Sequence, residues 1–318
     1  MERRVYPEKS PQMVFGMTRN RPLVSIGMPV YNSEQHIRCA LDSVLAQDYE
    51  HFEVIISDNA STDETEKICL GYASRDSRIR YYRNERNMGM AWNANRVFEL
   101  SSGEYFKWAG SHDYVAPSFI SACKQILDTD HRVVLAYPLA RVIDGNGGTI
   151  TEIVPEIVDT RKLPTFARVL VVVGKAEKCA LEFYGLFRAS ALRRCRPLST
   201  VIGNDHVLLM EISFLGSIAL VPEVLFYRRE IGPPLTEDER IATALMRLSP
   251  GASKRGSVRP HWDLGIQHVI GAWRLASLRK KSYLVPLVAH TYYWRRYEQL
   301  KRELRRPYRL DEYKEPDF

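Results

Sequence analysis

Short apolar segments alternate with helix-like patterns from residue 23 to residue 140. The apolar segments have the length of strands, and between them apolar residues recur at helical spacing. This alternation is typical of an α/β chain, in which a mostly parallel, doubly wound sheet carries helices on its faces. The expected strands are Leu23–Val30, Phe52–Ser57, Ile79–Arg83, Tyr105–Ala109 and Val133–Tyr137.

Local signals predict the helices and turns around these strands. Ser33 and Thr62 have hydroxyl groups that can accept hydrogen bonds at a helix start, so we expect both to be N-caps. Asp144-Gly-Asn-Gly-Gly predicts the tip of a hairpin, and residues 155–180 show no readable pattern. The other expected elements are helices at Ala91–Leu100, after Pro117, at Asp205–Leu215 and from Trp262, and an extended segment at Ala219–Tyr227.

The carboxyl ends of parallel strands form the ligand-binding edge of such a sheet. Three loops follow the expected strands at this edge: Pro29–Ser33, Asp58–Asp63 and Gly110–Asp113. Each loop places polar groups directly after an apolar strand. We therefore expect a binding site where the three loops meet.

Two aspartates have positions suited to catalysis. Asp113 follows a strand, and a carboxylate there can bind Mg²⁺ or Mn²⁺, which take oxygen ligands and often share them with a diphosphate. The alternative is that Asp113 caps the helix after Pro117. Asp205 precedes an apolar helical pattern, so it is either a general base or an N-cap favoured by the helix dipole.

The remaining polar residues also allow two interpretations. The acceptors of Asp58–Asp63 can pair with a base and a ribose, or can simply stabilise a turn. Asn87-Met-Gly-Met is interpreted as a turn that leads into the helix containing Asn95 and Arg96. Trp108 is a strand residue beside the expected site.

Charge divides the chain into a nearly neutral body and a basic tail. From Lys254 to the last residue there are 15 Lys/Arg and 7 Asp/Glu, whereas the rest of the chain has 30 and 31. A body without excess positive charge argues against a nucleic-acid partner. Hydrophobic residues make up 45% and charged residues 26%, a balance that excludes wholesale disorder.

The cysteines and apolar runs bear on the cellular location. Five widely spaced cysteines fit neither a zinc site nor a disulfide framework, so we expect isolated thiols in a reducing compartment. The first residues show no signal-peptide pattern, and the longest apolar runs are shorter than the ~20 residues of a membrane span. We therefore expect a cytoplasmic protein.

The order of these motifs resembles the family 2 glycosyltransferases, which have the GT-A fold. The resemblance covers Leu23–Arg229 and rests on loose motifs in series: VSIGMPVYN, EVIISDNASTDET, NMGMAWNANR, GEYFKWAGSHD, GNDHVLLMEISFLG and VPEVLFYRR. It implies a Rossmann-like domain that transfers a sugar from a nucleoside-diphosphate donor, by family tendency UDP, to a glycan or lipid-linked acceptor of the cell envelope. No G-x-G-x-x-G follows the first strand, which disfavours a dinucleotide enzyme.

The resemblance implies roles for the residues that match its motifs. Asp205 would be the general base of an inverting displacement, and Asp113 would bind Mn²⁺ or Mg²⁺ at the donor diphosphate. Trp108, Arg228 and Arg229 would lie on the diphosphate or acceptor side. The residues implied in nucleotide binding are Pro29, Tyr31, Asn32, Glu34, Asp58, Asn59, Gly89, Asn95, Arg96 and His112.

The chain departs from the family pattern at two places. Family members usually carry two adjacent carboxylates where this chain has Ser111-His112-Asp113, and histidine suits Mn²⁺ better than Mg²⁺. A His-Pro often follows the two arginines, whereas this chain continues with Glu230, which cannot donate a hydrogen bond to phosphate when ionised. Two interpretations follow: an active transferase, or a catalytically weak relative that binds nucleotide sugar.

Residues 262–310 combine aromatic side chains with many arginines. One interpretation is peripheral contact with the inner face of a membrane, where basic side chains meet anionic lipid and aromatic rings lie at the interface. The other is a set of helices packed on the catalytic domain or on a second subunit. The expected division is a lead-in at 1–22, a glycosyltransferase domain at 23–235 (nucleotide-binding half 23–140, acceptor half 141–235) and a basic, aromatic-rich helical region at 236–318.

Overall fold

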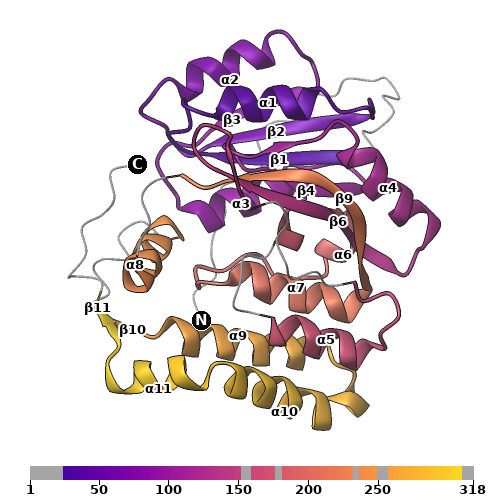
Figure 1. The fold of residues 1–318 in the computed structure, drawn as a ribbon, viewed down its shortest axis with the longest axis vertical. Coiled ribbons are helices and arrows are strands. Elements are labelled where there is room, and N and C mark those ends of the chain that lie inside the picture. Colours follow the sequence, from indigo (N-terminus) through magenta and orange to yellow (C-terminus); the bar gives the residue numbers. More distant parts are fainter. Residues whose placement is uncertain (1–23, 152–158, 176–180, 232–235, 249–256, 310–318) are drawn as a thin grey trace.

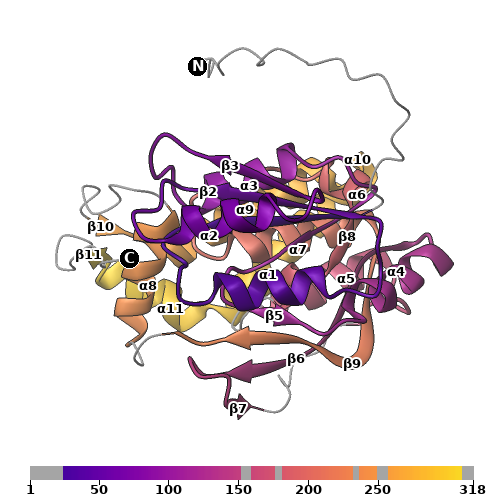
Figure 2. The ribbon, with the colours of Figure 1, turned by 90° about the horizontal axis from the view of Figure 1, so that it is seen from above.

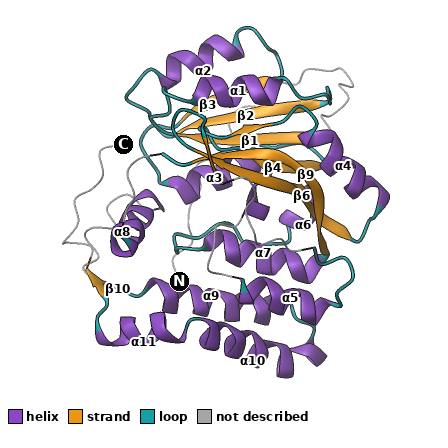
Figure 3. Cartoon of the chain, in the orientation of Figure 1, coloured by secondary structure: helices purple, strands orange, loops and turns teal. Residues whose placement is uncertain are grey.

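The computed structural model describes residues 24–151, 159–175, 181–231, 236–248 and 257–309, so the expected lead-in lies outside the described residues. Within these ranges the chain forms one large sheet between layers of helices (Figures 1 and 3). The strands of this sheet are β1 (Val24–Val30), β2 (Phe52–Asp58), β3 (Ile79–Arg83), β4 (Tyr105–Trp108), β5 (Tyr114–Val115), β6 (Val133–Ile143), β7 (Thr149–Thr151), β8 (Leu186–Arg188) and β9 (Ser217–Arg229).

The sheet is mixed but mostly parallel. Its strand order is β3-β2-β1-β4-β8-β6-β9-β5, with β7 paired to β6. Strands β1 to β4 are parallel to one another, β8 runs antiparallel to β4 and β6, and β6 pairs with β9 in parallel. Viewed from above, β2 and β3 lie on one side of the molecule and β6, β7 and β9 on the other (Figure 2). The α/β class and the five expected strands are confirmed.

Helices cover both faces of this sheet. They are α1 (Ile37–Leu45), α2 (Thr65–Ala73), α3 (Met90–Glu99), α4 (Phe119–Thr129), α5 (Thr165–Gly174), α6 (Ala189–Leu192), α7 (Asn204–Leu215), α8 (Glu237–Leu248), α9 (Pro260–Leu275), α10 (Leu278–Arg295) and α11 (Tyr297–Arg305). A two-stranded ribbon of β10 (Ser257–Val258) and β11 (Tyr308–Arg309) accompanies the last helices. Helices α10 and α11 lie at one end of the longest axis, opposite α1 and α2 (Figure 1).

Successive residues of β2 contribute to two different hydrophobic cores. Val54 and Ile56 pack in the core that also holds buried residues of α1, α2 and α4. Ile55 points the other way, into the core shared with α3, α5, α7 and α9. Because both faces are covered, the strand is apolar along most of its length. Full burial of a side chain of this size is worth about 1.5–3 kcal/mol.

Both predicted N-caps are wrong. Helix α1 begins at Ile37 with His36 as its N-cap residue, and the Ser33 hydroxyl instead donates to the Tyr31 carbonyl. Helix α2 begins at Thr65, where the backbone N–H donates to Oδ1 of Asp63. The hydroxyl-rich residues after β1 and β2 are used to hold loops together rather than to start helices.

The region after residue 140 contains one helix without a readable sequence signal. Val169, Val172 and Val173 of α5 are buried against α7 and α10. Its run of valines has the composition of a strand, and only the packing of neighbouring helices selects the helical form. The hairpin is confirmed, since β6 and β7 pair antiparallel and Gly147 has φ of 90° in the turn between them. The predicted boundary between the nucleotide-binding half and the acceptor half, at 140/141, falls inside β6.

None of the helices in the described ranges combines the length and the apolar composition that crossing a membrane requires. Four cysteines lie in those ranges, and all four are free thiols: Cys39, Cys69, Cys123 and Cys195.

Candidate active site

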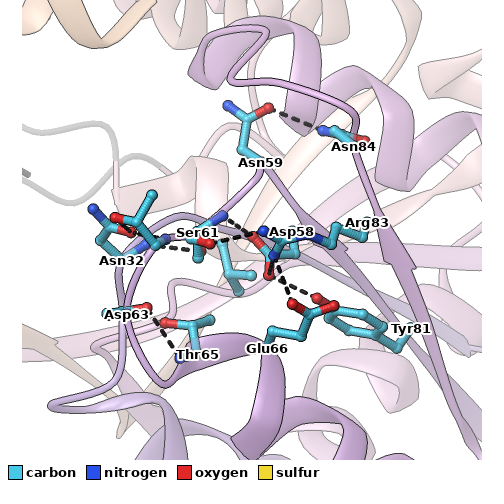
Figure 4. A network of polar contacts seen from close by, with 12 residues as sticks. Asn32, Asp58, Asn59, Ser61, Asp63, Thr65, Glu66, Tyr81, Arg83 and Asn84 are labelled. Atoms are coloured by element: carbon cyan, nitrogen blue, oxygen red, sulfur yellow. Dashed lines mark hydrogen bonds and ion pairs between the residues drawn. The ribbon is translucent and has the colours of Figure 1, made fainter.

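The loops after β1 and β2 are joined by hydrogen bonds. Both strands end side by side, with Val30 paired to Asp58. The backbone N–H of Asn32 donates to Ser61 Oγ at 3.0 Å, and the N–H of Thr62 donates to Asn32 Oδ1 at 2.9 Å. Figure 4 shows this network at the strand ends. The sequence-predicted meeting of these two loops is therefore present.

Two non-glycine residues of these loops have a left-handed backbone. Asn32 has φ of 43° and Ala60 has φ of 64°. Such conformations cost on the order of 1 kcal/mol each and cluster at functional sites, where neighbouring contacts maintain them. One such contact joins Ser33 N–H to Thr65 Oγ1 at 2.7 Å.

Asp58 organises the loop that follows β2. Its side chain is fully buried. The carboxylate accepts hydrogen bonds from the Ser61 N–H at 2.8 Å, the Tyr81 hydroxyl at 2.7 Å and Arg83 Nη1 at 3.1 Å (Figure 4). Burial, and then the bond to Asp58, raise the pKa of Tyr81. These contacts give Asp58 a structural role in addition to the nucleotide role that the resemblance implies.

Asn59 connects this loop to the segment before α3. Its Nδ2 donates to Asn87 Oδ1 at 2.6 Å, and its Oδ1 accepts from Asn84 Nδ2 and from the Met88 N–H, both at 2.9 Å. Gly89 follows with φ of 88° and ψ of 155°, a conformation that side chains rarely adopt, and α3 starts at the next residue. The N-terminus of α3 thus opens directly beside the loop after β2.

The other predicted nucleotide residues after β1 lie at the same edge. Glu34 is exposed, its Oε2 accepts the Glu64 N–H at 2.9 Å, and its own N–H donates to Asp63 Oδ2 at 3.1 Å. Pro29 and Tyr31 are half-buried at the end of β1. Their contact with a nucleotide remains a prediction.

The third loop carries Asp113 and is bonded to the first. Ser33 Oγ and Ser111 Oγ lie 2.8 Å apart. Asp113 is 4% exposed, and its Oδ1 accepts the backbone N–H of Arg229 at 2.8 Å. Its Oδ2 lies against Gly110, where an added Cβ would come within 2.4 Å of that oxygen. A side chain at position 110 would therefore displace the carboxylate from this place.

The capping alternative for Asp113 is wrong, because the N-cap residue of α4 is Ser118. His112 Nε2 lies 3.8 Å from Asp113 Oδ1, and the histidine side chain is 42% exposed. Among the described residues no group of three or more His, Cys, Asp and Glu side chains is placed to hold a metal ion. This chain therefore offers one carboxylate and one imidazole at this position.

Arg229 holds the third loop to the β6–β7 hairpin. Its Nε donates to the His112 carbonyl at 3.0 Å, and its Nη1 donates to both carbonyls of residues 144–145, at 3.0 and 2.8 Å. Neighbouring residues of a strand point to opposite faces, so Arg228 projects away from these partners. Glu230, one residue beyond β9, is exposed.

Two predicted residues of α3 use their side chains within the fold. The Asn95 amide donates to the Leu198 carbonyl at 2.9 Å and accepts the Leu198 N–H at 2.8 Å. The guanidinium of Arg96 lies 5.2 Å from the centre of the Trp92 ring. Asn95 thus fixes the segment that leads to α7, which carries Asp205.

Trp108 is an interior residue. It is 3% exposed, its Nε1 donates to the Ala94 carbonyl at 2.9 Å, and its ring stacks on Phe183 with centroids 4.5 Å apart. The expectation that it faces the diphosphate or the acceptor is therefore not supported by its burial. Large aromatic rings beside a strand end are explained equally well by core packing.

Asp205 lies in the first turn of α7 and is half-buried. The N-cap residue is Gly203, with φ of 78°, so the capping alternative for Asp205 is wrong. Its Oδ1 accepts the N–H of His206 at 2.9 Å. A cavity of about 250 Å³ opens beside this turn. It is lined by Arg196, Pro197, Leu198, Ser199, Asn204, Val207, Leu208, Glu211 and Gln267.

The sequence reasoning missed several residues of this region. Tyr81 and Arg83 lie two residues apart at the carboxyl end of β3. The rule that ligands bind at strand ends would have pointed to them if it had been applied to the third strand as well. No motif or spacing in the sequence marked His36 as a residue of the site. Burial, with smaller contributions from Arg229 and His112, lowers its pKa, and its Nε2 is buried without a hydrogen-bond partner in the described structure.

Lys107 is buried three residues before the third loop begins. It is 1% exposed, and its Nζ donates to the carbonyls of Trp108 at 3.0 Å and Tyr184 at 3.1 Å. The ammonium also lies 4.4 Å from the centre of the Phe119 ring. Burial lowers the pKa of Lys107 from 10.5 to about 8.

We expect the native chain to gain stability relative to Lys107→Met as the pH rises from about 8 to about 10.5. Folded Lys107 loses its proton near the lower value, whereas the unfolded chain keeps it until the higher one. The unfolded state binds more protons in this window, so the free energy of unfolding rises, by about 3 kcal/mol at most. Urea unfolding of both proteins across this range measures the difference. A difference that does not change with pH would contradict the assignment.

Hydrogen bonds join the loops after β1, β2 and β4 at the carboxyl ends of these strands, which is the edge where α/β enzymes generally bind their ligands. Residues 25–195 match the family model "Glycosyl transferase family 2". The match spans more than half of the chain, which therefore belongs to this family.

Curated relatives match this chain over shorter stretches than the family model does. An uncharacterized glycosyltransferase of Rickettsia felis is 36% identical over 140 residues, which are 43% of this chain and 23% of the relative. The putative teichuronic acid biosynthesis glycosyltransferase TuaG of Bacillus subtilis is 39% identical over 97 residues, 30% of this chain and 38% of TuaG. The chain spans less than half the length of these curated relatives.

Solved structures show the same fold. S. aureus TarS 1–349 in complex with UDP-GlcNAc has a TM-score of 0.54 at 15% identity, over 89% of this chain and 91% of that one. The mannosyltransferase PcManGT of Pyrobaculum calidifontis, in complex with GDP-Man and Mn²⁺, has a TM-score of 0.50 at 21% identity, over 89% and 77%. At these identities the likeness establishes the GT-A fold.

Proposed function

We propose that this chain is an inverting glycosyltransferase that moves a sugar from a nucleoside diphosphate, by preference UDP, to an acceptor hydroxyl. The observation that carries the proposal is the bonded set of three loops at the carboxyl ends of β1, β2 and β4, the third of which contains the buried Asp113. The fold neighbours TarS and PcManGT hold UDP-GlcNAc and GDP-Man, respectively. We place the nucleotide against Asn32 and Glu34, at the end of the first loop.

The catalytic step needs a base and a way to disperse negative charge. In our proposal the Asp205 carboxylate takes the proton of the acceptor hydroxyl, whose oxygen attacks the anomeric carbon while the bond to the diphosphate oxygen breaks. The backbone N–H groups at the start of α3, after Gly89, suit the diphosphate, because helix N-termini favour phosphate. The leaving group departs as the nucleoside diphosphate.

The residues present fit a divalent ion that completes its coordination with the donor. The carboxylate of Asp113 is seated against Gly110, and His112 is half-exposed beside it. Asp113 and His112 would hold such an ion, and one carboxylate with one imidazole would suit Mn²⁺ better than Mg²⁺. When bound, such an ion neutralises charge on the leaving diphosphate. PcManGT was solved with Mn²⁺.

Asp113 is a single carboxylate where family members usually have two, so a second function is considered: a relative that binds nucleotide sugar with weak catalysis. A screen of nucleotide sugars with and without Mn²⁺ separates the two. We expect one donor to raise the melting temperature, because a ligand that binds only the folded state stabilises it. For a transferase, that donor should release nucleoside diphosphate with Mn²⁺ and not with EDTA. Binding without release would favour the weak relative.

We further propose a cytoplasmic location. The support is the free state of the four described cysteines, two of which, Cys69 and Cys123, are buried. Unpaired thiols are typical of reducing compartments.

A further inference from the structure

Helix α10 packs one stripe of apolar side chains inward. Leu284, Val288 and Tyr292 recur every four residues and are at most 4% exposed. They face the neighbouring helices α5 and α9. A helix packed on one side normally presents polar and charged residues on the other side. The outer face of α10 does not follow this rule.

The outer stripe of α10 is formed by Tyr283, Leu287, His290 and Trp294. Their spacing of i, i+4, i+7 and i+11 places them on one line along the helix, away from the buried stripe. Tyr283 is 50% exposed and Trp294 is 62% exposed. The stripe extends over ~16 Å, given a rise of ~1.5 Å per residue. Large aromatic rings therefore face outward at the two ends of this stripe.

The exposed rings at the junction of α10 and α11 contact one another. Trp294 lies 5.8 Å from Tyr293, 6.0 Å from His290 and 6.1 Å from Tyr297, between ring centroids. Tyr293 and Tyr297 are 41% and 36% exposed. These contacts orient the rings without burying them, so their apolar surface stays available to a partner.

The segment that carries this aromatic face is rich in basic residues, although Arg296 is buried and Arg302 is paired with Glu237 and Asp238. From Leu278 to Arg306 the sequence has nine Lys/Arg and two Glu. One of the two, Glu303, is buried and bonded to His261. Arg279 and Lys280 are exposed one turn before Tyr283 on the same side of the helix. The face is therefore apolar along its centre and positive at its margin.

We propose that the outer face of α10 and the start of α11 bind the surface of an anionic lipid bilayer. Exposed tyrosine and tryptophan rings beside basic side chains match the headgroup region, where rings have an apolar body and a polar edge and Lys/Arg meet lipid phosphate. The helix lies parallel to the bilayer plane. Its place at one end of the longest axis leaves this face clear of the sheet (Figure 1).

Co-sedimentation of the full chain with lipid vesicles tests this proposal. We expect binding to vesicles of equimolar phosphatidylglycerol and phosphatidylcholine, and little to phosphatidylcholine alone. Each basic residue near an anionic surface contributes roughly fivefold in partitioning, so the double variant Arg279→Glu, Lys280→Glu should lose about 25-fold or more. Trp294→Glu should also weaken binding.

Matched controls come from helix α2, at the opposite end of the molecule. Leu70 is 49% exposed and the Lys67 side chain is 81% exposed, so Leu70→Glu and Lys67→Glu introduce glutamate at an exposed apolar and an exposed basic position elsewhere. They should bind vesicles as the native chain does. Circular dichroism of every variant confirms that the helices remain.

Three outcomes would overturn the proposal. The native chain could ignore anionic vesicles, or the α10 and α2 variants could lose binding equally. The third outcome concerns oligomerisation, which size-exclusion chromatography without lipid measures. If Trp294→Glu converts an oligomer to a monomer and leaves vesicle binding unchanged, the aromatic face joins two copies of this chain instead.

Discussion

Replacing Asp205 by asparagine is expected to lower kcat by at least about a hundredfold while leaving donor binding unchanged. General-base assistance is typically worth ~10²–10⁴ in rate. Asp205 is half-buried, and its one described contact in the fold is the 2.9 Å bond from the His206 N–H, which an asparagine oxygen can also accept. The variant thus removes the base and keeps the helix start. Steady-state kinetics and a nucleotide-binding titration measure the two quantities.

Glu237→Gln is the matched control, because Glu237 is likewise an acidic residue in the first turn of a helix, α8. Loss of such a charge costs about 0.3–1 kcal/mol of helix stability through the helix dipole. The control should therefore show a similar small change in stability and full activity. If Asp205→Asn keeps native turnover, the assignment of the base is wrong.

Asp113→Asn is expected to remove most of the Mn²⁺-dependent activity, again by about a hundredfold or more. A divalent ion supplies several kcal/mol of charge stabilisation in the transition state, and each 1.36 kcal/mol is about tenfold in rate. The asparagine oxygen can still accept the Arg229 N–H, so the loop and the β9 end remain joined. Turnover measured over a Mn²⁺ titration should show no recovery at high metal concentration.

His112→Asp supplies the contrasting variant. It restores a pair of adjacent carboxylates at a half-exposed position. Two oxygen ligands suit Mg²⁺ better than one oxygen and one imidazole. We expect the ratio of Mg²⁺-supported to Mn²⁺-supported activity to rise in this variant. An unchanged ratio, together with an active Asp113→Asn, would place the metal site elsewhere.

The strand-end loops show how far local sequence can be interpreted. The apolar run before Pro29 and the one before Asp58 predicted β1 and β2, and the rule for parallel sheets placed their loops at one edge. The Asn32–Thr62 and Ser33–Ser111 contacts then followed at that edge. The same local reasoning failed for the N-caps Ser33 and Thr62, because a hydroxyl can serve a helix start or a neighbouring loop, and the choice depends on a residue some 30 to 80 positions away.

Sequence alone determined the α/β class, the positions of the strands of the nucleotide-binding half and the family, since these depend on strand period, turn residues and motifs that can be identified along the chain. Only the tertiary structure decided which side chains are free to meet a ligand. Trp108 and Asn95 have ligand-compatible residue types but are engaged by Ala94 and Leu198. The physical reason is that burial and hydrogen-bond partnership come from contacts between residues distant in sequence, which periodicity does not encode.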